Sequence, residues 1–120
     1  WDFERFIRMG CVDVIQPDLS RCGGLTVALQ VRDLAAEAGI DLVPHSWLTH
    51  LLTASSLALV ATLPRAPFVE FNVAQSALTR GVTAGRPFTL DSEGCVAVPT
   101  GVGLGVEVDR DFIAAHRADR

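Results

Sequence analysis

Val43-Pro44-His45-Ser46 is the stretch that decides how this sequence folds, because there a histidine ends a short apolar run. Two carboxylates end apolar runs in the same way: Asp18 lies 27 residues before His45, and Glu70 lies 25 residues after it. Both intervals are about the length of one strand-plus-helix unit of an α/β barrel. Catalytic groups of such barrels lie at the C-terminal ends of the strands. We therefore expect these three ionisable side chains to converge on one cavity.

Apolar runs and helix-like stretches alternate through the first 71 residues. Strands are expected at Val12–Gln16, Ile40–Val43 and Phe68–Phe71, with helices from about Leu25 to Ala38 and from Ser46 to just before Pro64. This order, with short links, indicates parallel strands joined by right-handed crossovers. Residues 1–71 are therefore predicted to form the last units of a partial (β/α) barrel.

The helix expected at residues 25–38 has an apolar face and a natural end. Its buried stripe is expected to contain Val27, Val31, Leu34, Ala35 and Ala38. Gly39 suits the position just after a helix, and Ser46 is able to cap the helix that comes next. A further helical pattern over residues 3–7 stops at Gly10, so a helix is also expected there.

The pattern changes after Asn72, where glycine and proline interrupt short alternating runs. Phe88–Leu90 and Cys95–Val98 are predicted to pair as a hairpin around residues 91–94. Asp109 is placed to cap a last short helix that carries Phe112 and Ile113. Residues 72–120 are therefore predicted to be a C-terminal segment that packs against something else.

Composition bounds the kinds of partner. The 120 residues are 49% hydrophobic, which is enough to bury a core, and carry a net charge of −4. Arginines are scattered and form no basic stripe, which argues against nucleic acid as a partner. Lysine is absent, so this chain supplies no lysine base or Schiff-base former.

The most apolar stretch and the cysteines indicate a protein of the cytoplasm. Polar residues interrupt the stretch from Trp47 to Leu63, which therefore suits a buried helix better than a membrane span. The opening residues lack the pattern of a secretory signal. Cys11, Cys22 and Cys95 have no paired spacing and are expected to be reduced thiols.

Each motif also has a structural interpretation. His45 is able to serve as a structural histidine, Asp18 as a turn cap and Glu70 as a solvated charge, but their equivalent positions favour a joint role. Gly23-Gly24 favours a tight turn over an anion cradle, and the glycines of 101–105 lack the strand–turn–helix context of a nucleotide loop.

At the level of motifs the sequence resembles the enolase superfamily, and within it the mandelate racemase subgroup of the mandelate racemase/muconate lactonizing enzyme family. The motifs that carry the resemblance are Asp13-Val14-Ile15-Gln16-Pro17-Asp18, Gly23-Gly24-Leu25-Thr26, Val43-Pro44-His45-Ser46 and Phe68-Val69-Glu70. The segment from Pro99 to Asp109 resembles the usual C-terminal segment of the family. The resemblance spans nearly the whole chain.

This resemblance implies a fold and a set of roles. Asp18, His45 and Glu70 would end the sixth, seventh and eighth strands of a TIM-type barrel, and the tail would pack toward an N-terminal capping domain. His45 would be the general base, or the general acid in dehydrations, and Asp18 would orient it. Glu70 would hydrogen-bond the substrate carboxylate as this becomes an enediolate.

The implied chemistry is removal of a proton next to a carboxylate. That proton is very weakly acidic, so the enediolate needs strong stabilisation, as from Mg²⁺ working with a histidine or lysine base. A carboxylate on one ring nitrogen fixes the tautomer of the histidine. The implied substrate is a hydroxy acid or sugar acid. Of the two reactions, dehydration of an aldonate or aldarate is expected in preference to racemisation. The complete enzyme is expected to be a homo-oligomer.

One departure from the family pattern is large. The family holds its metal with three acidic residues at the ends of the third to fifth strands, and no acidic triplet at that spacing occurs here. We therefore expect the C-terminal portion of a longer enzyme, with no metal ligand among these residues. Two alternatives remain open: a non-catalytic barrel remnant that acts as a structural or interaction module, and a small flavodoxin-like binding domain.

Overall fold

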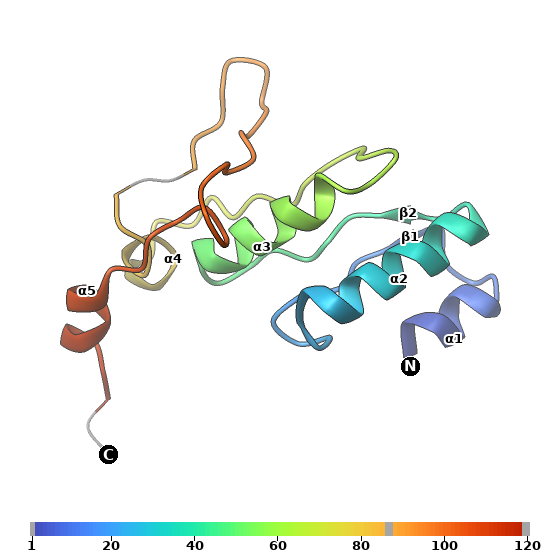
Figure 1. Cartoon of the computed structure of the whole chain (residues 1–120), viewed down its shortest axis with the longest axis horizontal. Helices are drawn as coiled ribbons and strands as arrows, with labels where there is room; N and C mark the ends of the chain where they lie inside the picture. The colour runs from blue at the N-terminus through green and yellow to red at the C-terminus, as the bar shows by residue number, and fades with distance from the viewer. Residues whose placement is uncertain (1, 86–87, 119–120) are drawn as a thin grey trace.

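A computed structural model describes residues 2–85 and 88–118 (Figure 1). Its elements are α1 (Asp2–Arg8), β1 (Val14–Ile15), α2 (Gly24–Ala38), β2 (Asp41–Leu42), α3 (His50–Val60), α4 (Ala77–Gly81) and α5 (Arg110–Ala115). The two strands pair in parallel, and α2 packs against β2 and against both α1 and α3. This is the β/α alternation expected from the sequence, with shorter strands.

The register of β1 and β2 places the candidate residues side by side. Val14 lies opposite Asp41, and the pairing continues past the strands to a parallel bridge between Asp18 and His45. Backbone hydrogen bonds of this pairing run from Asp41 N to Asp13 O (3.3 Å), Val43 N to Ile15 O (3.0 Å) and His45 N to Pro17 O (3.1 Å). Both polar residues therefore lie at the carboxyl end of the same parallel pair.

Helix α2 covers this pair and confirms the expected helix almost to the residue. It ends at Gly39, whose φ of 69° is the left-handed conformation that glycine adopts without strain. The prediction of its buried face was partly wrong. Val31 and Ala35 are buried as expected, but Ala28 replaces Val27 and Leu34, which are only half-buried, and Ala38 in the last turn is exposed. The small side chains of Ala28 and Ala35 let the helix lie close to its neighbours.

The helix after His45 begins later than expected. Ser46 does not cap it, because α3 starts at His50 with Thr49 in the capping position. The delay comes from a tight turn in which Thr49 N–H donates to Trp47 O (3.2 Å) around Leu48, whose φ is 74°. A bulky residue rarely adopts this conformation, and it breaks the helical path. The helix also ends at Val60, before Pro64.

Helix α3 joins two hydrophobic clusters, which explains why its sequence is apolar nearly all round. Leu52 and Leu59 belong to the first cluster, and Ala54 and Leu57 to the second. The other buried members of the first cluster are Ile7, Ile15, Leu19, Ala28, Val31, Ala35 and Leu42. Phe88 completes the buried part of the second. The described residues contain no helix with the length and apolarity that crossing a membrane requires.

The strand expected at Phe68–Phe71 does not form. Among the described residues, no backbone hydrogen bond joins this segment to β2. Pro67 has no N–H to donate to a ladder, and Phe68 is 75% exposed. Val69 and Phe71 instead pack against the second hydrophobic cluster. Side chains rather than a ladder therefore hold this segment beside α3.

The expected hairpin of the tail is reduced to its turn. A single antiparallel bridge joins Leu90 to Val96, and no strand extends from it. Asp91 Oδ1 closes the turn by accepting hydrogen bonds from the amides of Glu93 (2.9 Å) and Cys95 (2.8 Å). The turn prediction is confirmed, but with one bridge the flanking residues do not become strands.

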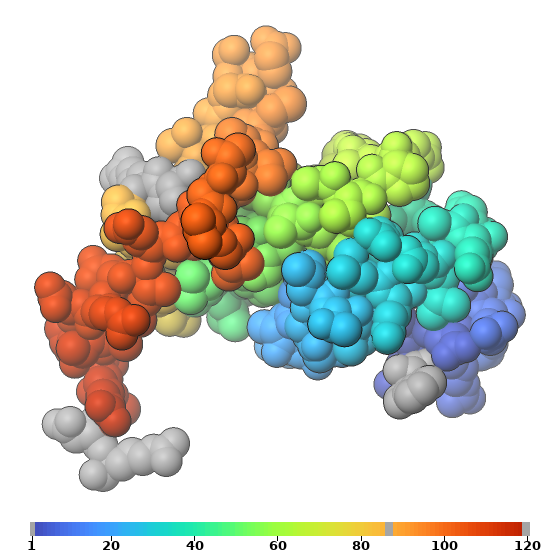
Figure 2. Space-filling model, in the orientation of Figure 1, coloured from blue at the N-terminus to red at the C-terminus, as the bar shows by residue number. Residues whose placement is uncertain are grey.

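The last helix agrees with its prediction. Asp109 Oδ1 accepts a hydrogen bond from Phe112 N–H at 2.8 Å and so caps α5. This helix has no buried residue and projects from the rest of the chain, as does the loop around residue 91 (Figures 1 and 2). The tail thus offers exposed surface, and its role as a separate segment from residue 72 stays a prediction. All three cysteines are free thiols, as expected.

Candidate active site

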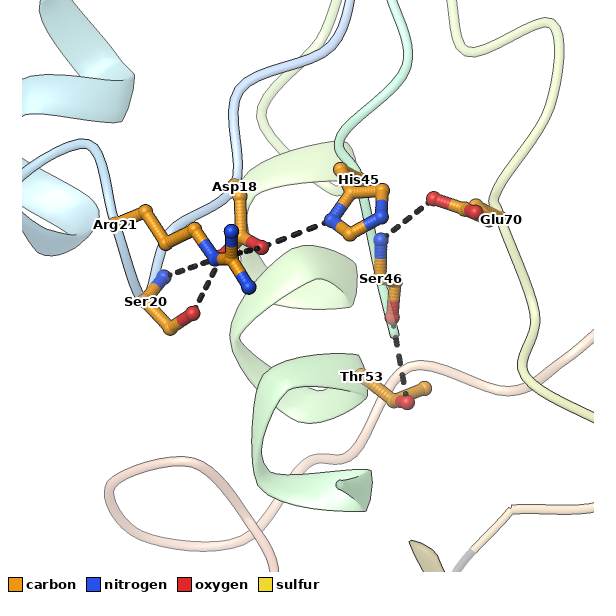
Figure 3. A network of polar contacts seen from close by, with 7 residues as sticks. All are labelled: Asp18, Ser20, Arg21, His45, Ser46, Thr53 and Glu70. Atoms are coloured by element: carbon orange, nitrogen blue, oxygen red, sulfur yellow. Dashed lines mark hydrogen bonds and ion pairs between the residues drawn. The ribbon is translucent and has the colours of Figure 1, made fainter. Parts of the chain in front are cut away.

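His45 and Asp18 form a hydrogen-bonded pair at the end of the parallel strands (Figure 3). His45 Nδ1 lies 2.8 Å from Asp18 Oδ2. The Asp18 side chain is only 11% exposed, whereas that of His45 is 41% exposed. Among the described residues, no hydrogen-bond partner faces His45 Nε2. One ring nitrogen is therefore held by a carboxylate while the other is open to a ligand.

Asp18 is held on both of its oxygens. Its Oδ1 accepts hydrogen bonds from the amide (2.8 Å) and the hydroxyl (2.6 Å) of Ser20. Its Oδ2 accepts from His45 and lies 3.6 Å from Arg21 Nε, whose side chain is 75% exposed. Burial works to raise the pKa of Asp18, but the hydrogen bonds from Ser20 and His45 outweigh it and lower that pKa below its ordinary value.

The ionised state of Asp18 settles which atom carries the proton in the pair. A carboxylate only accepts hydrogen bonds, so His45 Nδ1 carries the proton and donates it. In the neutral imidazole Nε2 then keeps a lone pair. The turn-capping role of Asp18 is also present, because Ser20 in the turn donates to Oδ1. The two roles use different oxygens of one carboxylate.

Glu70 lies on the other side of His45 from Asp18, as Figure 3 shows. It is half-buried, and its Oε2 accepts a hydrogen bond from the backbone N–H of Ser46 at 2.7 Å. The structure thus brings together all three residues predicted from the sequence. It also adds Ser20, Ser46 and Thr53 as residues that hold them. Of these three residues, the sequence pointed only to Ser46, because it directly follows His45.

A cavity of about 830 Å³ opens beside the pair. Asp18, Arg21 and His45 line it together with residues of α1 and α2. Within the described residues β1 pairs with β2 alone, so its other edge is free. The candidate site therefore lies at the rim of a hollow that these residues leave open.

The described residues do not form the metal site that the resemblance implies. Residues 2–85 and 88–118 contain no group of three or more His, Cys, Asp or Glu side chains that could hold an ion. Both oxygens of Asp18 and one oxygen of Glu70 already accept hydrogen bonds from the protein. A hard cation such as Mg²⁺ needs several oxygen ligands. These residues therefore do not suit Mg²⁺.

The other motifs have structural roles. The N–H of Gly24 donates to Leu19 O, so the Gly23-Gly24 turn does not present this amide to an anion. His50 is buried against Phe71 and Phe88, with ring centroids 6.3 Å and 5.4 Å away. Burial, and then the positive charge of Arg80, lower the pKa of His50. His50 is thus neutral at neutral pH.

Comparison with known proteins identifies relatives of this chain. The family described as "Enolase C-terminal domain-like" matches residues 1–112. The chain is 33% identical over 116 residues to the D-galactarolactone cycloisomerase of Agrobacterium fabrum (strain C58 / ATCC 33970), a match that covers 90% of this chain and 30% of that relative. The chain thus spans less than a third of the length of this curated relative.

Solved structures agree. The 3,6-anhydro-D-galactonate cycloisomerase from Zobellia galactanivorans is 37% identical, with a TM-score of 0.85 over 95% of this chain and 32% of that one. The mandelate racemase/muconate lactonizing enzyme from Jannaschia sp. CCS1 is 28% identical, with a TM-score of 0.83 over 99% of this chain and 30% of that one. These matches exclude the flavodoxin-like alternative. The chain therefore belongs to the enolase C-terminal domain-like family and has the C-terminal portion of the α/β fold of its mandelate racemase-type relatives.

Proposed function

We propose that this chain forms part of an enolase-superfamily enzyme that removes a proton α to a substrate carboxylate. His45 is the general base, Asp18 orients it, and Glu70 hydrogen-bonds the carboxylate as it becomes an enediolate. One observation carries the proposal: Asp18 holds His45 Nδ1 at 2.8 Å while Nε2 faces no protein partner among the described residues. A carboxylate on one ring nitrogen and a free lone pair on the other is the arrangement that a histidine base needs.

The proton moves as follows. Asp18, kept ionised by its hydrogen bonds, accepts the Nδ1 proton of His45 in a hydrogen bond, and this leaves the lone pair on Nε2. Nε2 takes the α-proton of the substrate, and the electron pair of the broken C–H bond moves into the carboxylate to give the enediolate. The imidazolium that results is stabilised by the negative charge of Asp18, only 2.8 Å away.

Glu70 lies on the opposite side of His45 from Asp18 (Figure 3), and its role is to bind the carboxylate of the same substrate. The amide of Ser46 holds Oε2, which leaves Oε1 for the substrate. In its protonated form Glu70 donates a hydrogen bond to the enediolate oxygen, where negative charge develops. A donor aimed at developing charge commonly contributes more to the rate than to substrate binding.

The cofactor and substrate follow from the family and stay proposals. Mg²⁺ in the complete enzyme would stabilise the negative charge of the enediolate, with ligands outside the described residues. The substrate is a small carboxylate of the hydroxy-acid or sugar-acid class, and the names of two cycloisomerase relatives support sugar acids. Loss of the α-proton is a first step common to dehydration and racemisation, and dehydration remains the first expectation. We also keep the cytoplasmic location and the homo-oligomer as proposals, with neither nucleic acid nor membrane as a partner.

Exchange of the α-proton with deuterated solvent tests this function. In the complete enzyme, with a panel of aldonates and aldarates, His45→Asn should slow exchange by about 10²–10⁴-fold, because a general base contributes that much. His116→Asn is the matched control, since His116 is exposed on the tail and its ring contacts Phe112, in its own helix turn. Equal exchange in wild type and His45→Asn would remove the histidine from the reaction. If the wild-type enzyme exchanges the α-proton of no acid in the panel, the result would instead support the non-catalytic module.

A further inference from the structure

Glu70 belongs to a segment whose backbone is not fixed by a sheet. In the described part of the chain, Phe68–Phe71 makes no ladder hydrogen bond to β2. Strand ladders are what usually hold catalytic groups at the ends of barrel strands. The position of the Glu70 carboxyl group therefore depends on its own contacts, of which the 2.7 Å hydrogen bond from Ser46 N–H is the one recorded for its carboxylate.

Ser46 is built into the core at this point. Its exposed fraction is 0%, although it directly follows the half-exposed His45. Its hydroxyl donates to Thr53 Oγ1 at 3.3 Å, one turn into α3 (Figure 3). Thr53 is itself only 1% exposed. Ser46 thus links Glu70 to α3: its backbone N–H binds Glu70, and its side chain binds the helix.

Thr53 in turn contacts His50, and His50 reaches back to the segment of Glu70. Thr53 Oγ1 lies 3.4 Å from His50 Nδ1. Because burial keeps His50 neutral, this nitrogen is able to accept a hydrogen bond from the Thr53 hydroxyl. Thr53 Oγ1 in turn accepts a hydrogen bond from the Ser46 hydroxyl. The His50 ring packs against Phe71, the residue after Glu70. The start of α3 therefore contacts Ser46, which holds Glu70, and Phe71, which follows Glu70 in the chain.

We propose that Ser46 and Thr53 are positioning residues that hold the Glu70 carboxyl group where the enediolate forms. The proposal rests on the function proposed above and adds to it two residues that never touch the substrate. The hydroxyl pair fixes the orientation of the Ser46 peptide, and the Ser46 N–H then fixes Oε2 of Glu70. With Oε2 held, Oε1 has one direction in which to meet the substrate. Preorganisation of this kind lowers the barrier without tightening substrate binding.

Two buried serines give a matched test in the complete enzyme. Ser46→Ala should lower kcat by about 10–100-fold with KM little changed, because misplacing a catalytic group costs on that order. Ser56→Ala is the control: Ser56 is also 0% exposed and lies in α3, but its hydroxyl has no partner among the described residues. It should keep kcat, since no hydrogen bond is lost. Equal kcat in the two variants would overturn the proposal.

Thr53 supplies a second test that separates positioning from folding. Thr53→Val keeps the shape of the side chain but removes the acceptor, so kcat should fall as in Ser46→Ala. Thr53→Ser keeps the hydroxyl and should restore kcat. Thermal midpoints are measured on the same samples. A fall in kcat that follows the thermal midpoint in all variants, Thr53→Ser included, would show a structural role only.

Glu70→Ala, which removes both the acceptor and the donor of the side chain, distinguishes failure of this inference from failure of the role proposed for Glu70. If Glu70→Ala keeps full activity, then Glu70 has no catalytic role, and the positioning role that rests on it fails with it. If Glu70→Ala loses activity while Ser46→Ala and Thr53→Val keep it, the role of Glu70 stands and the positioning role is wrong. If all three lose kcat and Thr53→Ser keeps it, the inference holds.

Discussion

Replacement of Asp18 by asparagine tests the His45–Asp18 pair with almost no change of shape. The asparagine oxygen is able to keep both hydrogen bonds from Ser20 that Oδ1 now accepts. The amide nitrogen takes the place of Oδ2 and donates where Oδ2 accepted. His45 Nδ1 must then accept, which moves the ring proton to Nε2. In that tautomer His45 cannot take the α-proton.

The two consequences of this change differ in size. For folding, one charge-assisted hydrogen bond of about 1.5–3 kcal/mol is weakened, and the contact with the exposed Arg21 contributes at most about 1 kcal/mol. For catalysis, loss of a general base costs about 10²–10⁴-fold, or roughly 3–5 kcal/mol. The corresponding aspartate change in a serine protease costs about 10⁴-fold. At the 10⁴-fold figure, or about 5 kcal/mol, the loss of rate should exceed the loss of stability, which is at most about 4 kcal/mol.

The assay measures α-proton exchange and the thermal midpoint on the same preparation of complete enzyme. Asp33→Asn is the control, because Asp33 is an exposed carboxylate on α2 whose ion-pair partner is Arg32. It should change neither quantity. The double variant of Asp18 and His45 should be no slower than the slower single variant, since both disable one unit. A lowered midpoint with near-normal exchange in Asp18→Asn would refute the reasoning and leave a turn cap.

Two further predictions concern stability. Because the pKa of Asp18 is lowered on folding, its ionised form stabilises the folded state fully above the unfolded pKa of about 3.9, and this contribution disappears as pH falls through the folded pKa. Acid denaturation is followed by circular dichroism, and the two profiles are scaled to equal stability at neutral pH. Unfolding should then begin at a higher pH in wild type than in Asp18→Asn. Identical acid profiles would contradict this prediction. Leu59→Ala should cost about 2–5 kcal/mol of unfolding free energy in a denaturant titration, because Leu59 is 0% exposed in the first cluster. Val102→Ala, at a fully exposed position, should cost less than about 0.5 kcal/mol, and similar losses in the two variants would show that the cluster is not a core.

Local sequence patterns determined much of this fold. The helix over residues 24–38 and its end at Gly39 follow from helical periodicity and from a glycine in the left-handed conformation, both of which are local properties. The cap of α5 by Asp109 is local in the same sense. The 27-residue interval between Asp18 and His45 also predicted their meeting, because strand–helix–strand units return the chain to the same edge.

Tertiary contacts decided the rest, because those features depend on partners distant in the sequence. The sequence of Phe68–Phe71 is typical of a strand, yet a strand exists only where a ladder partner accepts its hydrogen bonds. A serine at position 46 suits a helix cap. Its amide instead donates to Glu70 and its hydroxyl to Thr53, so the helix begins later. The residue types around His45 were thus readable from the sequence. Which of their atoms meet was set by packing, because each group takes the partner that burial brings within reach.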